Sequence, residues 1–158
     1  MIHIGIDPGK SGGLCYIRSG DGEPDDWDTT KMPETETDIG YWFEEVSESL
    51  REDGEQVFEK VGSMPVNAAR AMLTFGTNYG FLRACLICNK IPFEEVLPLK
   101  WQSGLGIVKR KKTETKTQFK NRLKAKAQSL FPHLKINLSN CDGLLIAEFN
   151  RRTRERNF

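Results

Sequence analysis

Three carboxylates stand beside apolar segments that are far apart in the sequence. Asp7 ends the apolar stretch 2–6, and Glu59 ends a shorter apolar stretch. Asp142 comes directly before the apolar run 143–147. An ionised carboxylate next to a hydrophobic segment is costly unless a cation or hydrogen bonds compensate its charge. Each acid alone also fits a structural role, as a turn former, an ion-pair partner or a helix N-cap.

If the three carboxylates converge in the fold, their mutual repulsion requires a cation between them. Oxygen ligands suit a hard divalent ion, so Asp7, Glu59 and Asp142 predict a site for Mg²⁺, with Mn²⁺ able to replace it. Carboxylates that hold such ions beside a basic surface suggest two-metal hydrolysis of a phosphodiester.

The overall net charge of +1 hides a basic segment at residues 99–126. This segment carries ten basic side chains and one acid, Glu114, whereas residues 1–59 carry 16 acids and four bases. A local charge of this size attracts a polyanion, although a basic run can also be a solvated helix face. Contacts to phosphates would give affinity without sequence readout. The candidate DNA-binding residues of the segment are Lys100, Lys109, Arg110, Lys111, Lys112, Lys116, Lys120 and Lys124.

Length and composition limit the class of protein. The 158 residues, 38% of them hydrophobic, suffice for one compact domain over 1–158. No apolar run approaches the roughly 20 residues of a membrane helix, and the N-terminus lacks the basic region of a signal peptide. The four cysteines have no framework spacing, which indicates a reduced, intracellular protein. A secreted disulfide scaffold is therefore excluded, and no membrane partner is expected.

Periodicity and turn residues place the acids and the basic segment on a mixed α/β domain. Strands are predicted at 2–6, 12–17, 27–32, 56–61 and 93–97, and helices at 37–51, 67–89, 98–105, 114–130 and 141–150. A flexible basic loop is expected at 106–113, and an arginine-rich tail at 151–158. Trp101 is expected in the core rather than on DNA. The backbone of 9–13 could approach a phosphate closely, because glycine has no Cβ.

One face of the longest predicted helix carries small and apolar side chains. Its members are Ala69, Met72, Leu73, Gly76, Gly80, Ala84 and Ile87. The face could pack on the sheet or against a second copy of the chain, and the sequence leaves both possibilities open.

Several motifs together resemble a known family. The run Ile4–Leu14 resembles the opening motif of the RuvC Holliday junction resolvases, within the RNase H-like nuclease superfamily. Glu59 stands where that family has its glutamate. The segments 76–80, 93–101, 130–132 and 142–148 are similar to later family segments, especially those of phage, poxviral and plant organelle members. The resemblance extends over about residues 2–152.

The resemblance implies a five-stranded mixed β-sheet flanked by α-helices, and a homodimer. It also implies Mg²⁺-dependent paired cuts in a four-way DNA junction, with Asp7, Glu59 and Asp142 as metal ligands. Lys116 or Lys120 would offset charge at the transition state. Met64 is the apolar candidate near the position where bacterial members have a phenylalanine wedge.

The sequence departs from the family pattern near its end. The family commonly has a further acid three or four residues before the last one, where this chain has Ser139 and Leu138. Asn140 or a backbone oxygen could serve instead. Gly143 replaces the usual alanine, which should cost some helix stability.

Two other functions remain open at this point. One is a catalytically weak branched-DNA-binding protein that retains the nuclease fold, and the absent fourth acid favours it. The other is an ATP-binding sugar-kinase-like domain, because its phosphate loop has a similar glycine pattern. Such kinases need two lobes and a longer chain.

Overall fold

The computed structural model describes residues 2–19, 24–50, 56–59 and 69–155. Within these ranges, the side chains of 24–26, 48–50 and 56–59 are not described.

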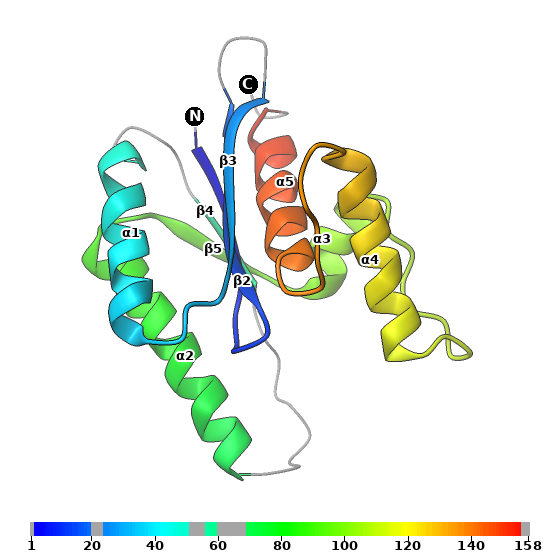
Figure 1. Cartoon of the computed structure of the whole chain (residues 1–158), viewed down its shortest axis with the longest axis horizontal. Helices are drawn as coiled ribbons and strands as arrows, with labels where there is room; N and C mark the ends of the chain where they lie inside the picture. Colours follow the sequence, from blue (N-terminus) through cyan, green and yellow to red (C-terminus); the bar gives the residue numbers. More distant parts are fainter. Residues whose placement is uncertain (1, 20–23, 51–55, 60–68, 156–158) are drawn as a thin grey trace.

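The centre of the fold is a mixed sheet with the strand order β3-β2-β1-β4-β5 (Figure 1). Its members are β1 (Ile2–Asp7), β2 (Gly13–Ser19), β3 (Pro24–Lys31), β4 (Gln56–Glu59) and β5 (Phe93–Val96). The first three strands form an antiparallel meander, β4 pairs with β1 in parallel, and β5 pairs with β4 in parallel. The predicted mixed α/β architecture is therefore confirmed, with strand ends shifted by a few residues.

Helices cover both faces of the sheet. One face carries α1 (Glu36–Leu50) and α2 (Ala69–Cys88), and the other carries α3 (Pro98–Gly104), α4 (Lys116–Leu130) and α5 (Cys141–Glu155) (Figure 1). A separate hydrophobic core lies under each layer. Trp101 is 1% exposed in the core beneath α5, which confirms the prediction of a core position.

Helix α5 packs directly on the central strand because two glycines allow it. A Cβ on Gly5 of β1 would lie 2.1 Å from the carbonyl oxygen of Gly143 and 2.2 Å from the nitrogen of Ala147. A Cβ on Gly143 would lie 2.9 Å from Cys15 Sγ on β2. Gly143 is therefore more than a helix-weakening replacement of alanine, since its missing side chain lets α5 approach the sheet.

The small and apolar face of α2 does not pack on the sheet. Leu73 is 72% exposed and Ile87 is 61% exposed, while Leu82 and Leu86 on the opposite side are fully buried. The alternative of packing within the chain is therefore wrong. The helix has apolar side chains on two faces, and the face with Leu82 and Leu86 is the one that packs in the core.

The predicted tail at 151–158 begins as a helix. Helix α5 continues to Glu155, and Arg151 and Arg152 donate to the buried carboxylate of Glu148 at 2.8 and 2.6 Å. These hydrogen bonds lower the pKa of Glu148 although burial acts in the opposite direction. None of the helices within the described ranges is long and apolar enough to span a membrane.

Candidate functional site

Asp7 and Asp142 come together at one end of the central strand. Asp7 is the last residue of β1 and pairs with Gly13 of β2, and Asp142 lies in the first turn of α5. A Cβ on Gly143 would lie 3.2 Å from the carbonyl oxygen of Gly13, so the start of α5 rests on the end of this hairpin. Two of the three predicted carboxylates therefore share one site.

The backbone brings Glu59 to the same edge of the sheet. Strand β4 runs parallel to β1 with Phe58 opposite Ile6, and it ends at Glu59, one residue later. Carboxyl ends of parallel neighbours meet at one edge. The side chain of Glu59 lies outside the description, as does Met64. The metal-ligand roles of Asp7, Glu59 and Asp142 and the wedge role of Met64 stay predictions.

Lys120 makes an ion pair at this site, whereas Lys116 is exposed to solvent. The Lys120 ammonium group makes an ion pair with Asp142 Oδ2, whose side chain is 8% exposed. Burial alone would lower the pKa of Lys120, but the charges of Asp142 and Asp7 outweigh it and raise that pKa. Lys116, one turn earlier on α4, is exposed. The sequence analysis proposed both lysines. Of the two, Lys120 is the one that contacts Asp142 at the start of α5.

The thiols of Cys15 and Cys141 lie near the carboxylates and are neutral. Cys141 Sγ lies 3.3 Å from Asp142 Oδ1, and burial raises the pKa of the Cys141 thiol to about 12. Burial also raises the pKa of Cys15. Because both thiols stay protonated near neutral pH, the charged donors described at this site are carboxylate oxygens, which suit Mg²⁺. Among the side chains that are described, no cluster of three or more His, Cys, Asp or Glu residues forms.

The side chain of Asn140 makes hydrogen bonds within the chain. Its Oδ1 accepts a hydrogen bond from the Asn137 nitrogen at 2.8 Å, and its Nδ2 donates to Thr29 Oγ1 at 2.7 Å. The amide therefore ties the turn before α5 to β3. Ser139 donates its hydroxyl to Asn137 Oδ1 at 2.6 Å and lines the groove beside the site.

The glycine-rich turn after Asp7 serves internal packing. Gly9 has a φ of +102° and donates its N–H to Asn78 Oδ1 on α2 at 2.8 Å. A Cβ on Gly12 would lie 2.0 Å from the Asp7 carbonyl oxygen, and one on Gly13 would lie 2.7 Å from the Ser139 carbonyl oxygen. The small residues at 12 and 13 are therefore explained by contacts within the chain, without a phosphate.

A groove of about 1050 Å³ opens beside the carboxylates, and it contains two lysines that the sequence analysis did not name. Lys10 and Lys31 line it together with Lys120 and Ser139. Lys31 pairs with Gly13, which pairs with Asp7, so the strand register could have placed Lys31 here.

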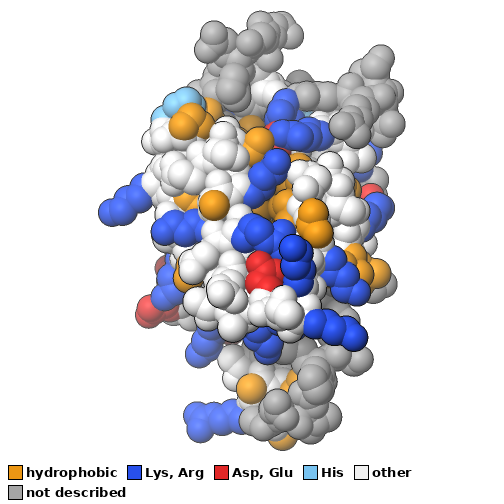
Figure 2. Space-filling view, turned by 90° about the vertical axis from the view of Figure 1, so that its right-hand side faces the viewer, with side chains coloured by type: hydrophobic (Ala, Val, Ile, Leu, Met, Phe, Trp, Pro, Cys, Tyr) orange, Lys and Arg blue, Asp and Glu red, His pale blue; other side chains and the backbone are white. Residues whose placement is uncertain are grey.

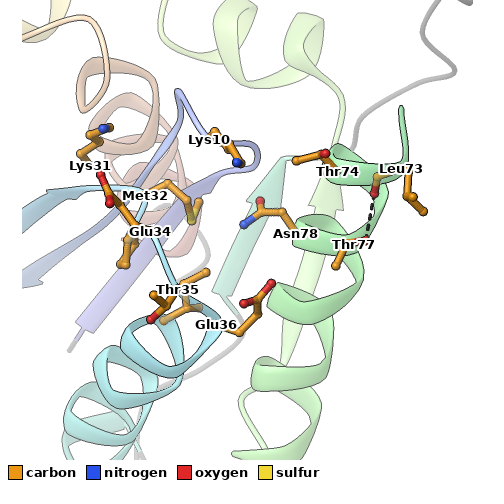
Figure 3. Close-up of a pocket in the computed structure, with 12 residues that line it drawn as sticks. Lys10, Lys31, Met32, Glu34, Thr35, Glu36, Leu73, Thr74, Thr77 and Asn78 are labelled. Carbon is orange, nitrogen blue, oxygen red and sulfur yellow. Dashed lines mark hydrogen bonds between the residues drawn. The ribbon is translucent and has the colours of Figure 1, made fainter. Parts of the chain in front are cut away.

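A second cavity of about 610 Å³ adjoins the groove on the side of α1 and α2. Lys10 and Lys31 line it, together with Glu34 from the segment before α1 and Glu36 from the first turn of α1 (Figure 3). Thr74, Thr77 and Asn78 enter from α2. The two lysines therefore line both the groove beside the carboxylates and the α1–α2 cavity.

The predicted basic surface lies on the side of the molecule formed by α3 and α4. Figure 2 shows Lys and Arg side chains spread across this side, with few acids among them. Residues 109–112 are all exposed. Lys100 is partly neutralised by an ion pair with Glu94. The remaining candidates are exposed, except Lys120 and Lys124, which are partly buried.

No protein-family model and no curated protein matches this chain. Two solved structures from Thermus thermophilus are similar over nearly the whole length. RuvC alone has a TM-score of 0.58 at 18% identity, with 98% of this chain and 97% of that chain covered. RuvC in complex with a Holliday junction substrate has a TM-score of 0.60 at 16% identity, with 97% and 96% covered.

The chain has a RuvC-like fold. This result confirms the predicted RNase H-like α/β class. The likeness to phage, poxviral and organelle members stays a prediction. In the RuvC-like fold of this chain, the described part of the site consists of Asp7, Asp142 and Lys120 beside a groove.

Proposed function

We propose that the protein is a Mg²⁺-dependent, structure-selective DNA endonuclease that resolves four-way junctions by paired symmetric cuts. The observation that carries this proposal is the meeting of Asp7 and Asp142 at the end of β1 in a RuvC-like fold. The groove beside them and the exposed lysines of the α3–α4 side supply a path for a phosphodiester backbone.

The described donors fit a hard divalent cation, because both are carboxylates and the adjacent thiols are neutral. Asp7, Asp142 and Glu59 would hold the metal. When bound, Mg²⁺ would lower the pKa of a water molecule and stabilise the leaving oxygen. Lys120 holds Asp142 by its ion pair and places a positive charge next to the position of the phosphate. Lys10 and Lys31 would contact the phosphates on either side.

Lys120→Met is expected to reduce cleavage of saturating junction by about 100-fold, since one preorganised charge at the reacting phosphate is lost. Lys116→Met is the matched control, because it removes the same charge from an exposed position of the same helix. Its cleavage rate should stay within about two-fold. Single-turnover cleavage of a labelled junction measures both rates, and equal losses would contradict the assignment of Lys120.

We also propose a homodimer through the exposed face of α2, because two symmetric cuts need two sites related by a two-fold axis. Leu73 and Ile87 present apolar surface there, and the glycines 76 and 80 meet no atom within 4 Å on the side where a Cβ would stand. A second backbone can therefore approach closely.

Leu73→Glu is expected to convert the dimer to a monomer, since a buried unpaired carboxylate is costly at an interface. Leu99→Glu is the control, because Leu99 is 54% exposed on α3, away from α2. Analytical ultracentrifugation at micromolar concentration should give twice the chain mass for the native protein and for Leu99→Glu. It should give a single chain mass for Leu73→Glu. A monomeric native chain would rule out this interface.

One observation favours a second candidate function, that of a catalytically weak branched-DNA-binding protein. Ser139 stands where the resemblance expects an acid, and the Asn140 side chain is engaged elsewhere. Such a protein would bind the junction through the basic surface without hydrolysis. The kinase alternative would need a second lobe, and the described residues form one sheet.

The deciding experiment incubates the native chain with a mobile four-way junction and a linear duplex of the same sequence, with Mg²⁺ or with a chelator. Symmetric nicks in the junction alone, dependent on Mg²⁺, support the endonuclease. Tight junction binding without nicks supports the second candidate. Hydrolysis of ATP without DNA affinity would contradict both.

A further inference from the structure

The basic loop, residues 108–113, has no helix or strand of its own. It contains four consecutive cations, 109–112, which repel one another. Its start is anchored by Ile107, which is 7% exposed and donates its N–H to the Gln102 carbonyl oxygen at 2.8 Å. Its end leads to Thr115, the N-cap of α4. Without further contacts, the loop between these anchors would sample many conformations.

Glu114 and Arg122 form a clasp that holds the loop at both ends. Arg122 on α4 donates from Nε and Nη2 to the two carboxylate oxygens of Glu114, at 3.0 and 2.9 Å. The same guanidinium donates from Nη1 to the Val108 carbonyl oxygen at 2.8 Å. Glu114 also accepts the Lys111 N–H at 3.3 Å, and its own carbonyl oxygen accepts from Arg110 at 2.6 Å.

The clasp joins the basic loop to α4 across a space between them. A hollow of about 620 Å³ lies between them, lined by Val108, Lys111, Thr113, Glu114, Gln118 and Arg122. The hydrogen bonds from Arg122 hold the pKa of the Glu114 carboxyl below its usual value, so the clasp is charged at neutral pH. Glu114 is the one acid of the segment 99–126.

We propose that Glu114 and Arg122 are positioning residues that hold the basic loop in a single conformation for contact with the DNA backbone. The inference rests on the proposed function and deepens it. A loop that is ordered before binding loses less conformational entropy on the DNA. The single acid of the basic segment therefore strengthens DNA binding, whereas its charge alone would weaken it.

The test uses the fact that the charge of Glu114 and its positioning role have opposite effects on DNA affinity. Glu114→Ala removes a negative charge from a DNA-binding surface, so simple electrostatics predicts tighter binding to a four-way junction. Loss of positioning predicts weaker binding instead, by about three- to ten-fold at constant salt. Arg122→Lys keeps the charge but cannot make the forked contact, and it should weaken binding similarly. Arg18→Lys is the matched control, because it makes the same substitution at an exposed position of β2 outside the basic segment, and its affinity should equal that of the native chain.

The salt dependence separates positioning from a lost phosphate contact. Lys112→Gln should reduce the slope of log affinity against log salt concentration by about one. Glu114→Ala should leave this slope unchanged while affinity falls. Tighter binding by Glu114→Ala, or a native affinity for Arg122→Lys, would overturn the inference.

Limited trypsin digestion tests the clasp without DNA. Cleavage after residues 109–112, measured by mass spectrometry against cleavage after Lys90, should be several-fold faster in Glu114→Ala than in the native chain. Equal cleavage would overturn the clasp. If the native chain binds no DNA, the proposed function fails and the DNA role of the clasp fails with it. The inference is supported if Glu114→Ala and Arg122→Lys bind the junction more weakly than the native chain and the control, and if trypsin cleaves their basic loop faster.

Discussion

Asp7→Asn is expected to abolish junction cleavage while junction binding persists. The substitution keeps the shape of the side chain but removes the charge that would hold Mg²⁺ at the end of β1. Loss of several kcal/mol of transition-state stabilisation corresponds to a rate about 1000-fold lower. Affinity should stay within about three-fold, because binding rests on the lysines of the basic surface. Single-turnover cleavage and a gel-shift titration measure the two quantities.

Asp28→Asn is the matched control for this experiment, since Asp28 is an exposed aspartate on β3. It should cleave at the native rate. Cleavage by Asp7→Asn at a native rate would refute the metal-ligand role.

Gly5→Ala is expected to give the largest loss of stability. The new Cβ would overlap the backbone of α5 at Gly143 and Ala147, at 2.1 and 2.2 Å, and backbone cannot move aside as a side chain can. Overpacking at such a contact should lower the free energy of unfolding by about 3 kcal/mol or more. The melting temperature should fall by roughly 6–12 °C in a chain of this size. Differential scanning calorimetry measures this change.

Gly40→Ala is the control, because Gly40 lies inside α1 and meets no atom within 4 Å where a Cβ would stand. It should raise the free energy of unfolding by about 0.5–1 kcal/mol, since alanine is the better helix former. A small effect of Gly5→Ala would mean that α5 can move away from β1, and the placement of Asp142 would then lose its basis.

The elements of this fold could be predicted from the sequence, because each follows from local periodicity and turn residues. The packing face of α2 could not. Its small residues and Leu73 repeat with helical spacing, and so do Leu82 and Leu86. Spacing alone cannot tell which of two apolar faces meets the sheet, and the bulkier set took the core.

The site could be predicted only in part. Asp7 and Asp142 could be proposed as site residues from the sequence, because a charge beside an apolar segment is a local signal. The choice between Lys116 and Lys120 depends on where α4 crosses α5, which is a tertiary property. Lys10 and Lys31 could not be recognised from the sequence, because each is an ordinary exposed lysine there. The turn between β1 and β2 brings Lys10 beside the groove, and the register of β3 brings Lys31 there.

Asn78 links helix α2 to the turn that follows Asp7. Its Oδ1 accepts the Gly9 N–H, so the inner face of the helix holds the turn that follows Asp7, while Leu73 and Ile87 face outward. A helix with its side chains is about 10–12 Å across. A second protomer that packs on the outer face of α2 would therefore lie about one helix diameter from the turn after Asp7 in the first protomer. Synchrony between the two incisions would then need no long-range signal.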